Sequence, residues 1–144
     1  MQAPLVVTNP LGTGLILIGA PVIERMSRYR QIGSADREAG GVLLGSLRGP
    51  HMEVSGCTEP LSGDKRSRML FDRCDPRHVA AVRASMSDSR GTIGYIGEWH
   101  THPERSPQPS GLDQTNWRHL LSQAGHRLVF VIVGTETSFI HAME

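Results

Sequence analysis

Short apolar runs alternate along the chain with segments whose apolar residues recur at helical spacing, and glycine, proline or small polar residues separate them. Short continuous runs are typical of strands, whereas recurrence every three to four residues is typical of helices. The predicted strands cover residues 15–19, 41–47, 52–57, 69–71, 92–101, 128–133 and 139–142. The predicted helices cover residues 22–32, 75–87 and 110–125. Because hairpin turns join neighbouring strands and helices interrupt the series, we expect an α+β fold in which helices flank a central mixed or antiparallel sheet.

The second and third predicted helices have recognisable starting residues. Asp75 followed by Pro76 supplies an N-cap and a first-turn proline, and Ser110 supplies the N-cap of the third helix. Apolar residues at helical spacing then predict the face of each helix that packs on the sheet. These residues are Val79, Val82 and Met86 in the second helix, and Trp117, Leu120 and Leu121 in the third.

The chain has 144 residues, which is the usual length of a single domain. Pro4, Pro10 and Gly12 predict a flexible N-terminal lead-in over residues 1–13, because these residues break regular structure. The domain itself is expected over residues 14–144.

Charge and cysteine content exclude several classes of protein. The 15 basic and 14 acidic residues give a net charge of +1, which argues against nucleic-acid or membrane-surface partners. No apolar run is long enough to span a bilayer, and no basic segment precedes the first run as it does in a signal peptide. Cys57 and Cys74 form no disulfide-like framework, which is typical of a reducing compartment. We therefore expect a cytoplasmic protein.

The stretch from Gly94 to Trp117 contains residues of the kind that bind metals. His100 and His102 are two positions apart at the end of a predicted strand, so both rings leave the same face. Asp113, in the first turn of the next helix, offers a carboxylate from a second rigid element. Two histidines and a carboxylate leave the fourth position of Zn²⁺ open, as in catalytic zinc sites. Each feature taken separately also fits a structural role, as a surface histidine pair or as an ordinary acidic first turn of a helix.

A zinc hydrolase needs a base that accepts the proton of the attacking water. Glu38, in the segment R-E-A-G-G-V-L-L-G, is the candidate. Its ordinary alternative is a solvated loop carboxylate. However, Gly40 and Gly41 directly after it indicate a backbone that lies close against another part of the molecule.

Together these residues resemble the motif of the JAMM/MPN+ metalloprotease family. That motif is a glutamate early in the chain, then H-x-H-P, then S-x-x-D, with seven residues between the second histidine and the serine. The residues that match it here are Glu38, His100, His102, Pro103, Ser110 and Asp113. The order of the predicted elements from Leu15 to Ala142 is also similar to the MPN fold of this family.

The resemblance implies that His100, His102 and Asp113 bind one Zn²⁺ and that Glu38 activates the water at the fourth position. It also implies that Ser110 hydrogen-bonds the developing oxyanion. Members of the family hydrolyse isopeptide or peptide bonds after the C-terminal tail of ubiquitin or ubiquitin-like proteins, and they often hold the tail as an extra strand. The implied protein is a metalloprotease whose partner is a protein with an extended C-terminal tail.

The residues around the motif, G-E-W-H-T-H-P-E and P-x-P-S-x-x-D, are similar to those of small bacterial JAMM proteins of CBASS anti-phage operons. Those proteins reverse E1/E2-type conjugation by removing a cGAS-like nucleotidyltransferase from its targets, and the resemblance implies the same role here. One alternative is the processing of a sulfur-carrier protein to expose its diglycine tail. Another is a non-catalytic MPN scaffold, against which the complete set of site residues argues.

Glu98 and the two tryptophans border the motif. Strand alternation places Glu98 on the face of the two histidines, where it either hydrogen-bonds an imidazole or is solvated, and we favour the first. Trp99 is expected to point to the opposite, core-facing side, with Trp117 packed nearby.

A basic cluster lies in the predicted loop over residues 60–68. It consists of Lys65, Arg66 and Arg68, which are expected to form either a solvated face or a surface that holds an acidic region of the substrate.

Overall fold

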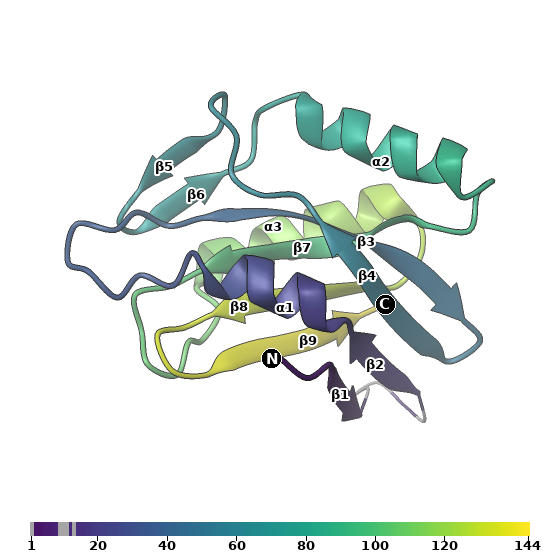
Figure 1. Cartoon of the computed structure of the whole chain (residues 1–144), viewed down its shortest axis with the longest axis horizontal. Helices are drawn as coiled ribbons and strands as arrows, with labels where there is room; N and C mark the ends of the chain where they lie inside the picture. The colour runs from purple at the N-terminus through teal and green to yellow at the C-terminus, as the bar shows by residue number, and fades with distance from the viewer. Residues whose placement is uncertain (1, 9–11, 13) are drawn as a thin grey trace.

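A curved mixed sheet forms the centre of the molecule in the computed structural model, which describes residues 2–8, 12 and 14–144 (Figure 1). Its strands are β1 (Leu5–Thr8), β2 (Leu15–Ile18), β3 (Gly40–Arg48), β4 (His51–Cys57), β7 (Gly94–Thr101), β8 (Leu128–Val133) and β9 (Ser138–Met143). They are ordered β1-β2-β4-β3-β7-β8-β9. The β2–β4 and β7–β8 pairs are parallel, and the other neighbouring pairs are antiparallel. A separate hairpin is formed by β5 (Lys65–Ser67) and β6 (Leu70–Asp72).

Three helices pack on this sheet within the described part of the chain, so the α+β prediction is confirmed. They are α1 (Ala20–Ser27), α2 (Arg77–Asp88) and α3 (Gly111–Ala124). In the view of Figure 1, α1 lies in front of the sheet and α3 behind it, while α2 packs along β3 and β7. Gly125 ends α3 with a φ of 72°, a left-handed conformation that favours glycine. None of the described helices is both long and apolar enough to cross a membrane.

The two faces of the sheet carry separate hydrophobic clusters. One joins α1 to the central strands and contains Trp99, which is buried as expected. The other joins α3 to β8 and β9 and contains Trp117, whose indole stacks on Phe130 with ring centroids 4.7 Å apart. The expected proximity of Trp117 to Trp99 is therefore wrong, because the strands separate the two rings. β8 is buried along its whole length since both of its faces are covered.

Three segments differ from the prediction. The lead-in predicted over residues 1–13 contains β1, which pairs with β2, whereas residues 9–11 and 13 lie outside the described residues. The first helix ends at Ser27 rather than near residue 32. The predicted loop over residues 60–68 contains β5, because its residues pair with β6.

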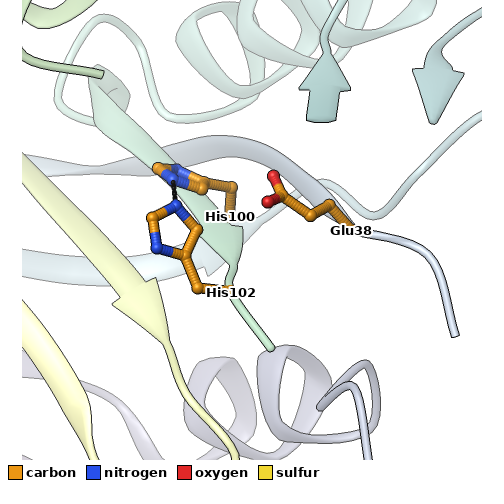
Figure 2. Close-up of side chains that lie close together, drawn as sticks. All are labelled: Glu38, His100 and His102. Carbon is orange, nitrogen blue, oxygen red and sulfur yellow. Dashed lines mark hydrogen bonds between the residues drawn. The ribbon is translucent and has the colours of Figure 1, made fainter. Parts of the chain in front are cut away.

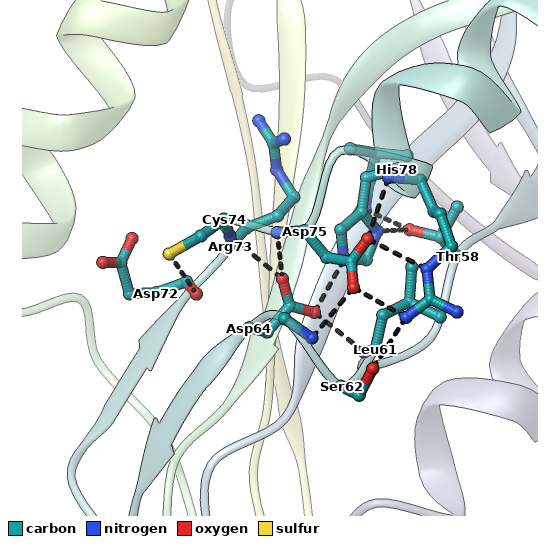
Figure 3. Close-up of polar contacts among 12 residues, drawn as sticks. Thr58, Leu61, Ser62, Asp64, Asp72, Arg73, Cys74, Asp75 and His78 are labelled. Atoms are coloured by element: carbon teal, nitrogen blue, oxygen red, sulfur yellow. Dashed lines mark hydrogen bonds and ion pairs between the residues drawn. The ribbon is translucent and has the colours of Figure 1, made fainter.

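The inward face of α2 was predicted only in part: Val82 is half-buried, but the other two predicted residues are exposed. Val79 and Met86 are 44% and 43% exposed, whereas His78 is fully buried. The reason is a polar network that accepts the imidazole: His78 Nε2 lies 2.7 Å from Asp64 Oδ2, and His78 Nδ1 lies 2.6 Å from Thr58 Oγ1 (Figure 3). A buried polar side chain is stable where its hydrogen bonds are satisfied, and this one has a partner on each ring nitrogen.

Asp64 extends the network to the long connection between β4 and α2. Its carboxylate accepts hydrogen bonds from the backbone amides of Leu61, Cys74 and Asp75 (Figure 3). The β5–β6 hairpin lies within this connection, so the network anchors both ends of the segment that carries it.

Candidate active site

The two histidines of the motif lie at the end of β7, in the middle of the sheet. His100 is paired with Gly40 of β3 on one side and with Ile132 of β8 on the other. His102 follows the strand directly, and its amide donates a hydrogen bond to the carbonyl of Val133. The backbone on both sides therefore fixes the rings, whose Nε2 atoms lie 3.0 Å apart (Figure 2).

Asp113 reaches the same point from the first turn of α3. Its Oδ1 lies 3.4 Å from His100 Nε2, and its Oδ2 lies 3.2 Å from His102 Nε2. The carboxylate is oriented by a capping box, in which Asp113 accepts from the Ser110 amide and Ser110 Oγ accepts from the Asp113 amide. The same local sequence that starts the helix thus aims the carboxylate at the two imidazoles.

The separations among these three side chains fit a tetrahedral zinc ion. Ligand atoms about 2.0–2.1 Å from zinc at tetrahedral angles lie about 3.3 Å from one another. The two ring nitrogens lie 3.0 Å apart, and each lies near one oxygen of Asp113: Oδ1 is 3.4 Å from His100, and Oδ2 is 3.2 Å from His102. These separations are close to that edge length, although the two Asp113 contacts use different oxygens. The donor set of two imidazoles and one carboxylate is one that zinc accepts, and it leaves a fourth position open. His100, His102 and Asp113 therefore form a set of atoms suited to hold the ion.

Glu38 faces the histidines from the other side, at the start of β3. One carboxylate oxygen of Glu38 and one ring nitrogen each of His100 and His102 lie within 4.8 Å of one another. Figure 2 shows the carboxylate pointing toward the rings. Glu38, His100 and His102 thus form a group that could hold a metal ion. Asp113 lies 3.4 and 3.2 Å from the same two ring nitrogens, so carboxylates from two elements face the histidine pair.

The close backbone approach expected from the glycines after Glu38 is present. A Cβ atom on Gly40 would lie 2.5 Å from the carbonyl oxygen of Trp99 and 2.6 Å from the ring of Phe71. A Cβ atom on Gly41 would lie 2.2 Å from the carbonyl oxygen of Thr58. Only glycine admits these contacts, so the segment that carries Glu38 is pressed against β7 and the hairpin.

Burial changes the acid–base properties of Glu38. The residue is only 4% exposed, and this desolvation raises the pKa of its carboxyl group to about 7, against the lowering effect of His102. Asp113 and Glu104 raise the pKa further through their negative charge. A carboxyl group with a pKa near neutrality is suited to accept and return a proton, whereas a solvated loop carboxylate is not.

His102 is held by carboxylates on both ring nitrogens. Glu104 Oε1 lies 2.8 Å from Nδ1, opposite the Asp113 contact to Nε2. Burial lowers the pKa of His102, but the hydrogen bonds with Asp113 and Glu104 outweigh it and raise the pKa to about 9. In Asp113, burial raises the pKa, while its hydrogen bonds with His100 and His102 hold the pKa well below the usual value. A metal ion would have to displace a proton from His102, because only the neutral imidazole is a ligand.

The imidazole partner is Glu104 and not Glu98, so the favoured expectation for Glu98 is wrong. Glu98 forms a two-pronged ion pair with Arg73, at 2.6 and 2.8 Å, and accepts a hydrogen bond from the Tyr95 hydroxyl. Arg73 lies on the connection after β6, and its planar guanidinium matches both carboxylate oxygens. Strand alternation placed Glu98 on the correct face, but it could not show that Arg73 would pair with Glu98 in place of an imidazole.

A cleft of about 830 Å³ opens over the site. The β5–β6 hairpin lines one wall with Met69, Leu70 and Phe71. The start of α3 lines another with residues that include Ser110 and Leu112. Ser110 is exposed at this wall, and its hydroxyl hydrogen is not used by the bond in which Ser110 Oγ accepts from the Asp113 amide.

Several residues that shape the site escaped the sequence analysis. They are Gln31, Arg73, Thr101 and Glu104. Glu104 lies two positions after His102, so a search near the histidines for a carboxylate that could bond an imidazole would have found it. Thr101 lies between the histidines in the sequence, but its partners Ala39 and Gln31 are distant in the chain. Arg66 is half-buried and Arg68 is exposed, and the guanidinium groups of both donate to backbone carbonyls between Gly33 and Glu38.

Comparison with known proteins agrees with this geometry. Residues 19–143 match the family described as prokaryotic homologs of the JAB domain. A Pseudomonas aeruginosa protein named CD-NTase/cGAS isopeptidase is 41% identical over 128 residues, covering 88% of this chain and 81% of the relative. A Vibrio cholerae protein of the same name is 38% identical over 130 residues, covering 90% of this chain and 83% of the relative.

A solved structure supports the fold. The solution structure of a Desulfitobacterium hafniense protein superposes with a TM-score of 0.59 at 23% identity, covering 87% of this chain and 80% of that one. This similarity concerns the fold alone, whereas the family match and the curated relatives extend over most of the sequence. The chain therefore belongs to the JAB domain family, among its prokaryotic homologs.

Proposed function

We propose that the protein is a zinc-dependent isopeptidase that releases a cGAS-like nucleotidyltransferase (CD-NTase) from conjugated targets by hydrolysing the bond after its C-terminal tail. This reverses E1/E2-type conjugation in bacterial anti-phage (CBASS) defence. The observation that carries the proposal is the convergence of two imidazoles and a carboxylate opposite the buried carboxylate of Glu38, at the base of a cleft. The relatives named CD-NTase/cGAS isopeptidase give the substrate class.

Glu38 transfers the proton in this proposal. Its carboxylate accepts a proton from the water that attacks the scissile carbonyl carbon, and the same carboxyl group then donates that proton to the departing amine. The bond between carbonyl carbon and nitrogen breaks, so the products are a free C-terminal carboxylate and a lysine or backbone amine. No covalent enzyme intermediate is needed, because water itself is the nucleophile.

The remaining site residues bind and orient. His100, His102 and Asp113 would hold zinc, which supplies Lewis acidity to the scissile carbonyl and the attacking water. Ser110 is exposed beside Asp113, and its hydroxyl donates a hydrogen bond to the oxygen that becomes negative. The cleft walls receive the extended tail of the nucleotidyltransferase, an extended segment of the kind that pairs with strand edges.

Substitution of single site residues separates the proposed roles. Glu38→Ala is expected to retain one zinc per chain while cleavage falls about 10²- to 10⁴-fold, the range for loss of a general base. His100→Ala and Asp113→Ala are expected to lose zinc and cleavage together. Zinc is measured by atomic absorption, and Glu24→Ala on the exposed surface of α1 is the control. Full activity of a preparation without bound metal would refute the zinc mechanism.

The substrate class is tested with two fusion proteins. A cGAS-like nucleotidyltransferase fused through its C-terminus to a reporter should be cut at the junction. A sulfur-carrier protein fused in the same way should remain intact. Cleavage of the sulfur-carrier fusion alone would show that the enzyme processes diglycine tails. Cleavage of neither fusion by the zinc-loaded protein would favour a non-catalytic scaffold.

A further inference from the structure

The β5–β6 hairpin holds the backbone of Glu38 from outside the sheet. The Glu38 amide donates a hydrogen bond to the carbonyl of Ser67 at 2.7 Å. The Arg66 Nε–H donates to the carbonyl of Glu38, also at 2.7 Å. Both contacts come from β5, which lies outside the main sheet and far from the motif residues along the chain.

On the side of the main sheet, β7 holds the backbone of Ala39, the residue after Glu38. The Ala39 amide donates to Thr101 Oγ1 at 2.9 Å, and the Thr101 amide donates to the Ala39 carbonyl at 2.9 Å. The Glu38 carbonyl and the Ala39 amide belong to one planar peptide group, so Arg66 and Thr101 hold the two ends of the same plane. The contact with Ser67 fixes the preceding plane. With both flanking planes fixed, the direction in which the Glu38 side chain leaves the backbone is fixed as well.

The hydrogen bond to the Glu38 carbonyl is the side-chain contact that defines the position of Arg66. Among the described residues Arg66 takes part in no ion pair, and its side chain is half-buried beneath the segment that it holds. It does not line the cleft. A substrate therefore does not need to touch Arg66 for the residue to affect catalysis, because the effect passes through the position of Glu38.

We propose that Arg66 is a positioning residue for the catalytic carboxylate: its hydrogen bond to the Glu38 carbonyl sets the orientation in which Glu38 reaches the attacking water. This inference rests on the proposed role of Glu38. It assigns to the basic cluster a function within the active site, in place of a solvated surface or a contact with the substrate.

The test compares Arg66→Met, which keeps the apolar stem and removes the donor, with Arg66→Lys, which restores a donor. Arg66→Met is expected to lower kcat about ten- to a hundredfold, as misplacement of a catalytic group does. KM should change less than about twofold, because binding of the ground state is untouched. Zinc content should equal that of the wild type, and Arg66→Lys should recover part of kcat. Lys65→Ala, on the same strand, removes one charge without loss of a contact to Glu38 and is the matched control.

A double-mutant cycle with Glu38→Gln ties the effect to its target. In that background, Arg66→Met should cause no further loss of kcat, because the group that it positions is already inactive. Unchanged kcat in Arg66→Met, or a loss of zinc that accounts for the whole loss of activity, would overturn the inference.

Amide hydrogen exchange supplies a readout that does not depend on activity. Exchange at Glu38 and Ala39 should be faster in Arg66→Met than in Lys65→Ala, because one of the contacts that hold this peptide plane is missing. Should Glu38→Gln retain full activity, the proposed function of Glu38 fails while the exchange result still decides whether Arg66 holds the segment. Equal exchange in the two variants would overturn the inference by itself.

Discussion

The hydroxyl of Thr101 accepts a hydrogen bond from the amide of Ala39, and this bond joins the strand of the two histidines to the segment of Glu38. Thr101 lies between His100 and His102 in the sequence, so its side chain points away from them to the opposite face of β7. The same hydroxyl donates to Gln31 Oε1 at 2.8 Å, and both residues are buried. The proposed base and the proposed ligands are thereby positioned through one residue.

Thr101→Val is expected to lower the free energy of unfolding by about 1–3 kcal/mol, because it leaves the buried Ala39 amide and Gln31 amide oxygen without their partner. Valine has nearly the same shape, so the loss reports the hydroxyl and not a cavity. Urea denaturation followed by circular dichroism measures it. Thr137→Val, whose hydroxyl bonds only exposed partners, should unfold at the wild-type midpoint. An unchanged midpoint in Thr101→Val would show that water replaces the missing contact.

Two substitutions of Ser110 separate helix capping from catalysis. Ser110→Ala should cost about 1 kcal/mol of stability, and Ser110→Gly only a few tenths, because glycine is a tolerated N-cap. If the hydroxyl stabilises the oxyanion, both substitutions should lower kcat equally, by about a hundredfold or more. Stability is measured by denaturation and kcat on the nucleotidyltransferase fusion. If kcat instead falls only in Ser110→Ala and stays close to wild type in Ser110→Gly, the role of Ser110 is to cap the helix and not to stabilise the oxyanion.

Gly40→Ala is expected to reduce both stability and cleavage. The new Cβ would overlap the Trp99 carbonyl and the Phe71 ring, and overpacking of this kind costs about 1–3 kcal/mol. Displacement of Phe71 moves the hairpin that holds Glu38. Gly56→Ala on β4 is the control, since its Cβ would meet Leu44 at an ordinary 3.6 Å. Wild-type melting temperature and kcat in Gly40→Ala would contradict the close packing.

The carboxylate of Asp64 makes stability depend on pH. Burial raises its pKa, but hydrogen bonds from the Asp75 amide, His78, and the Leu61 and Cys74 amides outweigh burial and hold the pKa below the usual value. A depressed pKa in the folded state contributes stability that is present above the pKa of the unfolded chain, about 3.9. This stability is lost as the pH falls through the lower pKa of the folded state.

Asp64→Asn should therefore be less stable than wild type at pH 7, and the difference should shrink as the solution is acidified below about pH 4. Denaturation midpoints at a series of pH values measure the difference. Asp72→Asn, on the exposed side of the hairpin, should follow the wild-type curve at every pH. A constant difference between Asp64→Asn and wild type across the series would show that Asp64 acts through shape and not through charge.

Local patterns predicted the elements whose signals are strong within a few residues. The continuous apolar run of residues 128–133 predicted a strand, which is β8, and Ser110 marked the start of α3. Alternation along β7 placed His100 and His102 on one side. These features depend on backbone geometry alone, so the sequence is sufficient to predict them.

Features that depend on a distant partner could not be predicted in this way. His78 is buried because Asp64 and Thr58 hydrogen-bond its ring, and helical spacing favoured Val79 and Met86 instead. Glu98 is drawn to Arg73, which lies 25 positions earlier in the chain. Glu38 was a candidate base because Gly40 and Gly41 follow it, but nothing in its own segment indicates the histidines, and only the resemblance to a family motif joined them.

Contacts to the backbone are the hardest to anticipate. Arg66 binds a carbonyl oxygen, a group that every residue has, so no complementary side chain marks its target. The isolated cluster Lys65, Arg66 and Arg68 indicates only positive charge. Its two arginines acquire different partners because the fold brings residues 33–38 beneath the hairpin.

The shared use of Asp113 has a consequence for protein engineering. A stabilisation campaign commonly redesigns helix starts, and capping rules alone would treat positions 110 and 113 as free choices among Ser, Thr, Asp, Asn, Glu and Gln. Here Asp113 Oδ2 accepts the hydrogen bond from the Ser110 amide and also faces His102. A screen for melting temperature measures the first contact but not the second. A substitution there that raises the melting temperature can still remove a proposed zinc ligand, and libraries built for this scaffold should leave both positions fixed.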